Sequence, residues 1–101
     1  MHTIAKLVEK MNEELDDACS YAKGAIAYKV EDKELAEVFL SLARTELEHY
    51  SKLSAQVDRL IEAKKAAGEV AIEGAMGLYS IMQDRMTAHM AEVRAMIDSY
   101  R

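Results

Sequence analysis

The stretch that decides the fold is Leu42-Ala43-Arg44-Thr45-Glu46-Leu47-Glu48-His49-Tyr50-Ser51-Lys52-Leu53. Its apolar ends belong to a stripe whose members are spaced alternately three and four residues apart, the pattern of one helix face. Glu46 and His49 occupy the same stripe, where a core-facing leucine is expected. Burying such groups without compensation costs several kcal/mol. The inward face of this helix is predicted to comprise residues 35, 39, 42, 46, 49, 53, 57 and 60.

A first helix is predicted over residues 4 to about 30, with one polar member, Glu14, on its stripe. A short connection follows, in which Asp32 is placed to cap the next helix, predicted over 33–66. Such a short connection implies an antiparallel hairpin. In an antiparallel hairpin, two residues that face each other across the helices have sequence numbers whose sum is nearly the same for every such pair. This rule places Glu14 opposite Glu46 and His49. The predicted stripe of the first helix is Ile4, Leu7, Met11, Glu14, Ala18, Tyr21, Ala25 and Tyr28.

The second helix is expected to end at Ala66-Ala67-Gly68, with Gly68 as the residue just beyond it. Residues 69–77 are interpreted as a loop or as a loosely started helix. A third helix then runs from about 75 to 100. Its predicted stripe is Leu78, Met82, Met86 (or His89), Val93, Met96 and Tyr100. The fold class is therefore all-α, with residues 1–101 forming a single domain.

Composition agrees with a helical bundle and excludes several functions. Half of the residues are hydrophobic, 31% are charged, proline is absent and the formal net charge is −5. This acidity argues against binding to nucleic acid or to an anionic membrane, and it favours cations. No apolar run is long enough to span a bilayer, and the N-terminus lacks the apolar core of a signal peptide. With Cys19 as the only cysteine, no disulfide framework is expected, and the cytoplasm is the predicted compartment.

Glu14, Glu46 and His49 are predicted to bind metal. A Glu-x-x-His pair projecting into a helical bundle is the half-site of a dinuclear carboxylate centre. The alternative is a buried ion pair or polar layer that fixes the register of the helices. His89 lacks a glutamate three residues before it and is interpreted as a packed or half-exposed histidine. Cys19 is interpreted as a small packing residue without chemistry.

A family resemblance adds to this prediction. Leu35-Ala36-Glu37-Val38-Phe39 followed by Leu42-Ala43-x-x-Glu46-x-x-His49 resembles the second helix of rubrerythrin-type and other ferritin-like proteins. Glu14 with Tyr21 is similar to the first helix of that family. The resemblance covers roughly residues 7 to 60. It implies a four-helix bundle with a dinuclear iron or manganese centre that oxidises Fe(II) or reduces O₂ or peroxide. Glu46 would bridge the metals, with His49 and Glu14 as terminal ligands, and zinc is a conceivable occupant.

The chain departs from the family in having one carboxylate helix and one Glu-x-x-His helix instead of two of each. Short encapsulated ferritins resemble this arrangement, and in them two chains pair their hairpins around the metals. A homodimer with Glu14, Glu46 and His49 of each chain near a two-fold axis is therefore expected. The alternative function is a non-catalytic helical interaction or assembly protein, for example one encoded by a phage or plasmid. In it the same three residues would hold a structural metal or form a polar layer.

Overall fold

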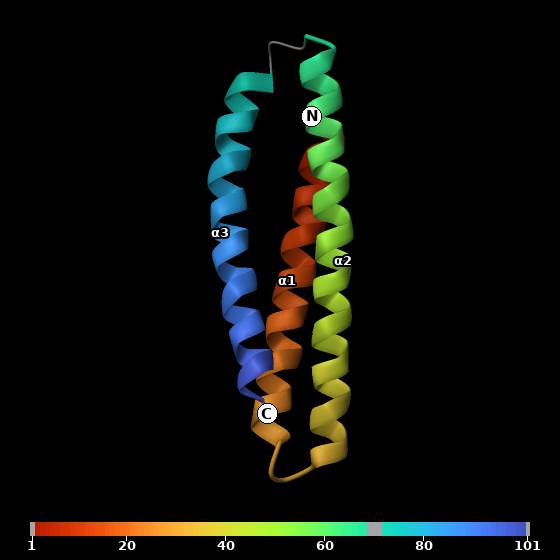
Figure 1. Cartoon of the computed structure of the whole chain (residues 1–101), viewed down its shortest axis with the longest axis vertical. Coiled ribbons are helices and arrows are strands. Elements are labelled where there is room, and N and C mark those ends of the chain that lie inside the picture. Colours follow the sequence, from red (N-terminus) through yellow and green to blue (C-terminus); the bar gives the residue numbers. More distant parts are fainter. Residues whose placement is uncertain (1, 69–71, 101) are drawn as a thin grey trace.

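Two long helices joined by a short turn, with a third helix packed along them, make up the structure. The computed structural model describes residues 2–68 and 72–100, including the side chains of 3–68 and 79–100. The helices are α1 (His2–Tyr28), α2 (Lys33–Ala66) and α3 (Ile72–Ser99), and the described ranges contain no strand. Successive helices run in opposite directions (Figure 1). The result is a rod of 56 × 17 × 17 Å.

The turn between α1 and α2 is closed by hydrogen bonds at both of its sides. The backbone N–H of Asp32 donates to the carbonyl of Tyr28 at 2.8 Å. The carboxylate of Asp32 accepts from the N–H of Leu35 at 3.1 Å, which satisfies one of the free donors in the first turn of α2. The predicted N-cap is confirmed, and α2 begins at the expected residue.

The far end of α2 is terminated by a glycine with a left-handed backbone. Gly68 has a φ of +72°, a conformation that costs other residues energy. Its N–H donates to the carbonyl of Lys65 at 3.0 Å, and the N–H of Ala67 donates to that of Ala63 at 3.1 Å. These bonds satisfy carbonyls in the last turn, as predicted for a glycine just past a helix end. Of the stretch expected as loop or loose helix, 72–77 belong to α3, whereas 69–71 lie outside the described residues.

The inward face of the hairpin differs from the predicted one by a rotation of about one residue. Of the eight positions predicted for α2, only Val57 is buried. In α1, half of the predicted stripe is buried, and three of the other four positions shift by one, so that Leu15 replaces Glu14. The buried residues of α1 are Ile4, Val8, Met11, Leu15, Ala18, Ala22 and Ala25, and those of α2 are Ala36, Leu40, Ala43, Leu47, Tyr50, Val57 and Ile61.

Side-chain size explains the rotation. α2 carries two neighbouring apolar stripes, one of which contains alanines whereas the other contains Leu35, Phe39, Leu42 and Leu53. Ala36 and Ala43 are fully buried, and short side chains let neighbouring helices approach closely. The stripe without alanines therefore lies at the rim of the α1–α2 contact, where Leu42 is 38% exposed.

We call this rim the edge stripe. It consists of Leu7, Glu14, Tyr21 and Tyr28 of α1 together with Leu35, Phe39, Leu42, Glu46, His49 and Leu53 of α2. Aromatic rings of both helices pack against one another in the edge stripe. The ring centroid of Phe39 lies 6.1 Å from that of Tyr21 and 6.0 Å from that of Tyr28. The Phe39 ring covers Gly24, where an added Cβ would lie 3.0 Å from a ring carbon. The surface left thin by the missing side chain of Gly24 is therefore filled by this ring.

The third helix completes the core with Tyr79, Met86, Val93 and Ile97. Met86 and Val93 were expected there, whereas Met82, Met96 and Tyr100 are only half-buried and Leu78 lies outside the described side chains. Near the turn, the Lys29 ammonium lies 5.1 Å from the centre of the Tyr100 ring, within cation–π range.

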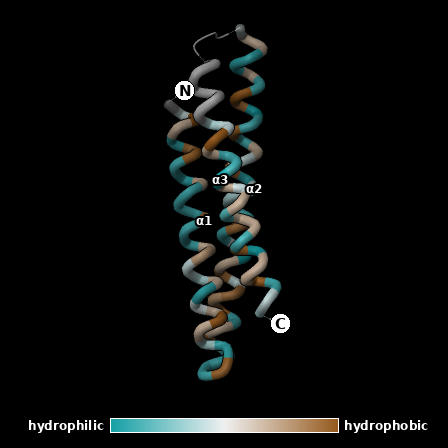
Figure 2. Tube along the Cα trace, turned by 90° about the vertical axis from the view of Figure 1, so that its left-hand side faces the viewer, coloured by the Kyte–Doolittle hydropathy of each residue, from teal (hydrophilic) through white to brown (hydrophobic). Residues whose placement is uncertain are grey.

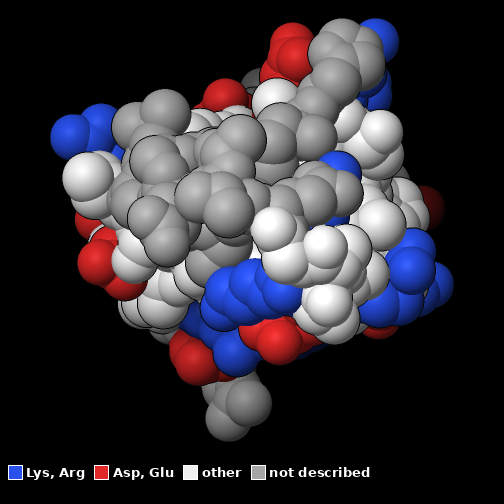
Figure 3. Space-filling view, turned by 90° about the horizontal axis from the view of Figure 1, so that it is seen from above, with Lys and Arg blue, Asp and Glu red and all other residues white. Residues whose placement is uncertain are grey.

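The distribution of polar residues fits this arrangement. Hydrophobic and hydrophilic segments alternate along the tube of α2, as expected for a helix with one apolar side (Figure 2). Seen from the end where α2 finishes, described residues of both charges are intermixed (Figure 3). Within the described ranges, every helix falls short of the length and apolarity that crossing a bilayer requires.

Candidate metal centre

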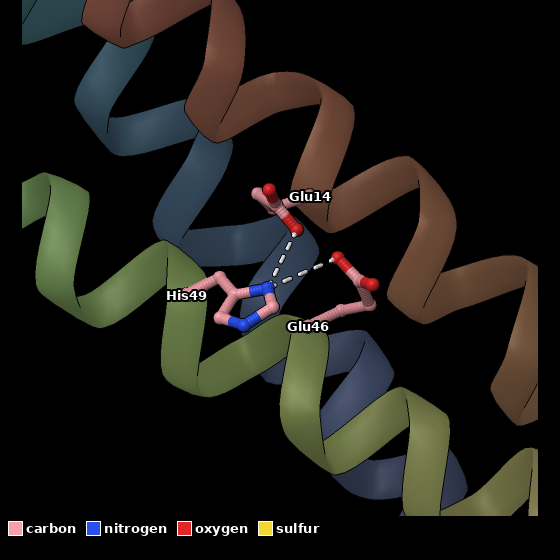
Figure 4. A group of neighbouring side chains, drawn as sticks. All are labelled: Glu14, Glu46 and His49. Atoms are coloured by element: carbon pink, nitrogen blue, oxygen red, sulfur yellow. Dashed lines mark hydrogen bonds and ion pairs between the residues drawn. The ribbon is translucent and has the colours of Figure 1, made fainter.

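Glu14, Glu46 and His49 meet on the edge stripe (Figure 4). Nδ1 of His49 lies 3.4 Å from a carboxylate oxygen of Glu14, within hydrogen-bond distance. The same nitrogen lies 3.7 Å from a carboxylate oxygen of Glu46. The imidazole therefore stands between a carboxylate on its own helix and one on the facing helix. The hairpin register predicted from the sequence brings the three residues together.

The core fixes the positions of the three residues. Each directly precedes a buried residue in the chain: Glu14 precedes Leu15, Glu46 precedes Leu47, and His49 precedes Tyr50. Because neighbouring residues on a helix are rotated by about 100°, packing the second of each pair inward sets the first at the rim. The trio is thus mounted on rigid helices, which gives a ligand set better precision than a loop would.

Glu14, Glu46 and His49 were predicted to face the core, and this prediction was wrong. The side chains of Glu14, Glu46 and His49 are 23%, 17% and 48% exposed, so they are partly solvated at the rim of the core. The cost of burying charge therefore does not by itself demand a cation at this site. What agrees with the prediction is the convergence of the three side chains at one level of the hairpin.

The spacing of the donor atoms suits a metal ion. One ligand atom from each residue can be chosen so that all three lie within 4.8 Å of one another. Two ligands bound to one ion at roughly 2.1 Å are about 3.0 Å apart in neighbouring octahedral positions and about 4.2 Å apart in opposite ones. The separations of 3.4 and 3.7 Å fall inside this interval. Binding of all three atoms to one ion would require every pair of them to lie within about 4.2 Å, somewhat closer than the 4.8 Å that bounds their present separations.

Charge at the site also favours a cation. Two carboxylates and one imidazole carry between one and two net negative charges, depending on the protonation of the ring. No lysine or arginine forms an ion pair with Glu14 or Glu46 within the described part of the chain. A divalent ion would remove the repulsion between the two carboxylates more completely than a protonated imidazole does.

The other candidate residues lie apart from this centre. His89 is half-buried beside a cleft lined also by Asn12, Met82, Arg85 and Met86. Cys19 is a half-buried free thiol, in agreement with its prediction as a packing residue. Within the described residues, the trio is the only group of three potential ligands close enough to share an ion. The prediction from the sequence had already named all three of these residues.

Comparison with models of known families, with characterised proteins and with solved structures finds no match to this chain.

Proposed function

We propose that the chain binds iron or manganese through Glu14, Glu46 and His49, and that two copies form a dinuclear carboxylate centre at their interface. The observation that carries the proposal is the convergence of three ligand atoms within 4.8 Å of one another, from two helices. Carboxylate and imidazole donors suit these two metals, and zinc is a further candidate occupant. The resemblance to ferritin-like proteins supports the same assignment.

A second copy is needed because one chain supplies too few ligands. Three donors fill half of a six-coordinate sphere, whereas two chains supply four carboxylates and two imidazoles, the set of a ferritin-like dinuclear site. Four carboxylates also balance the charge of two divalent cations. A two-fold dimer is the simplest assembly that brings two identical half-sites together.

The edge stripe is suited to be the interface of this dimer. His49 is half exposed there and is flanked along α2 by Leu42, 38% exposed, and by the half-buried Leu53. One long side of the rod measures 56 by 17 Å, about 950 Å², and a stable interface buries about 800 Å² on each partner. Pairing through this side would cover the apolar rim and exclude water from the metal ligands.

The reaction we propose is oxidation of Fe(II) with reduction of O₂ or peroxide. When two ions are bound, they supply one electron each to the oxidant. The chain's own residues would hold the ions: the resemblance implies a bridging role for Glu46 and terminal roles for Glu14 and His49, and Glu46 is the least exposed of the three. The packing of Leu15, Leu47 and Tyr50 beside the ligands limits their movement between oxidation states.

Anaerobic Fe(II) titration followed by exposure to air tests this reaction. The wild type is expected to develop near-ultraviolet absorbance faster than the variants Glu46→Ala and His49→Ala. Glu13→Ala is the matched control, because Glu13 adjoins Glu14 but is exposed and pairs with Lys10 at 3.3 Å. Equal rates in the wild type, in both site variants and in the control would contradict turnover at this site.

A specific observation favours the non-catalytic alternative as well. His49 already bridges the two carboxylates at 3.4 and 3.7 Å, so a protonated imidazole can serve as the cation of a polar layer. In that case the protein would be a helical interaction or assembly module. Saturating metal would then leave the thermal unfolding temperature unchanged, whereas a true site at about 100 times the Kd adds about 2.7 kcal/mol to the free energy of unfolding.

A further inference from the structure

A basic cleft lies between α2 and α3, away from the edge stripe. Its volume is about 490 Å³, and it is lined by Arg44, Leu47, Glu48, Ser51, Lys52 and Arg94. The residues from α2 lie on the side of its buried stripe opposite to Glu46 and His49, as their helical spacing requires. The cleft is therefore separate from the candidate metal centre.

Among the described residues, the three cations of the cleft form no ion pair with an acidic residue. In residues 3–68 and 79–100, no ion pair involves Arg44, Lys52 or Arg94, whereas Lys10 and Lys65 each pair with a glutamate three residues away. Glu48 is four residues from both Arg44 and Lys52, the spacing that favours helical ion pairs, but it does not come within 4.0 Å of either. Three cations and one carboxylate give the cleft a net charge of +2 in a chain whose formal net charge is −5.

The cleft also has an apolar component. Leu47 is only 8% exposed and lines the cleft between the charged side chains. The cleft is open to solvent, since all of its lining residues except Leu47 are exposed, but it has room for a small organic ligand that a few polar groups could orient. A ligand that uses the whole cleft would thus combine an anionic group with an apolar body.

We propose that this cleft binds an organic phosphate monoester. Such a group carries about −1.5 to −2 charges at neutral pH, which matches the net charge of the cleft. Arg44 and Arg94 approach from two different helices, and guanidinium groups donate paired hydrogen bonds to phosphate oxygens. Lys52 adds a third positive charge, Ser51 offers a hydroxyl, and Leu47 contacts the apolar body. Binding would also tie α3 to α2.

Titration with phenyl phosphate, followed by NMR of the full chain, tests the proposal. We expect saturable shifts at Arg44, Leu47, Ser51 and Arg94. Two smaller or less charged anions serve as comparisons: inorganic phosphate lacks the apolar body, and benzoate carries a single carboxylate charge. The affinity of each should be lower than that of phenyl phosphate by about tenfold or more. Arg94→Gln and Arg44→Gln should each lower the affinity for phenyl phosphate by about tenfold, the effect of losing one charge-assisted contact.

The matched control is Lys23→Gln, which removes the same charge from an exposed position on α1. It should leave the affinity within twofold of the wild type. An equal loss in Lys23→Gln and in the arginine variants would overturn the proposal, because binding would then follow net charge alone. Shifts that never saturate, or benzoate binding as tightly as phenyl phosphate, would overturn it too. The two arginine variants lie on different helices, so one remains informative if the other fails to fold.

Discussion

His49 on α2 reaches Glu14 on α1 across 35 positions of the sequence, with Nδ1 3.4 Å from the carboxylate oxygen. This contact joins the two helices at the rim of their interface and brings the Glu-x-x-His pair of one helix to the carboxylate of the other. The three side chains thus come from two helices whose register is set by the buried residues beside them.

Removal of the Glu14 charge should weaken metal binding. Glu14→Gln keeps the side-chain size but replaces a carboxylate ligand with a poorly coordinating amide. We expect the affinity for Fe(II) or Mn(II) to fall by about tenfold or more. Equilibrium dialysis followed by elemental analysis measures this change. Glu13→Gln, one residue away and exposed, should bind as the wild type does, and an equal loss in both variants would show that the effect is not local.

The contact between Gly24 and Phe39 should make Gly24→Ala destabilising despite the better helix propensity of alanine. Alanine gains roughly 1 kcal/mol in a helix, but its Cβ would lie 3.0, 3.2 and 3.3 Å from three carbons of the Phe39 ring. The ring would have to shift by a few tenths of an ångström in its packing with Tyr21 and Tyr28, whose ring centroids lie 6.1 and 6.0 Å away. We expect a net loss of about 1 kcal/mol in urea unfolding.

A double-mutant cycle that combines Gly24→Ala with Phe39→Ala provides the control for this prediction. In a Phe39→Ala background the obstructing ring is gone, and Gly24→Ala should then stabilise the chain by about 0.5–1 kcal/mol. A Gly24→Ala effect of the same sign in both backgrounds would contradict the steric explanation.

Tyr79 should cause stability to fall at alkaline pH. Its hydroxyl is buried, and no group among the described residues forms a hydrogen bond with it. Burial first, and then the negative charge of Asp58 and the nearby Tyr50, raises its pKa to about 12. Because this pKa is raised above the ordinary value of 10, the contribution to stability is fully present below pH 10 and is lost as the pH rises toward 12.

Tyr79→Phe isolates this effect. At neutral pH it removes an unsatisfied buried hydroxyl, and we expect a gain of about 1 kcal/mol in the free energy of unfolding. Between pH 9 and 11 the variant should lose less stability than the wild type. It should not become insensitive to pH, because burial followed by the charge of Asp58 also raises the pKa of Tyr50. Urea unfolding at the two pH values measures the difference, and equal losses would contradict the role of Tyr79.

The N-cap of α2 should be worth about 1 kcal/mol. Asp32→Ala removes the carboxylate that accepts from the N–H of Leu35 at 3.1 Å, together with a negative charge beside the positive end of the helix dipole. Glu31→Ala removes an exposed acid one residue earlier and should change the free energy of unfolding by less than about 0.5 kcal/mol. Similar losses in the two variants would argue against capping.

The sequence predicts the elements of this fold better than the rotation of the helices. Asp32 and Gly68 have strong local signatures, so the ends of α2 follow from short-range chemistry. The rotation of α2 depends on which of two adjacent apolar stripes faces inward. Periodicity alone does not decide between them, because Leu40 and Leu47 are as apolar as Leu42 and Leu53. The small size of Ala36 and Ala43 decides it.

The candidate site was predictable because it depends mainly on how far along the hairpin its residues lie. It depends less on how each helix is rotated about its own axis. A rotation error of one residue moves Glu46 and His49 from the core to the rim, but it leaves them level with Glu14. The basic cleft was not predictable in the same way. Arg44 and Lys52 share a side of α2, but Arg94 approaches them only through the packing of α3, for which the sequence offers no register signal.

The central claim is that metal binding and dimer formation depend on the same three residues. Sedimentation equilibrium of the purified protein at saturating Fe(II) or Mn(II), with the bound metal counted per chain on the same sample, tests it most directly. The account predicts a dimer with one metal ion per chain, and loss of both properties in Glu46→Ala. A monomer at saturating metal, or a dimer of Glu46→Ala that retains one ion per chain, would contradict it.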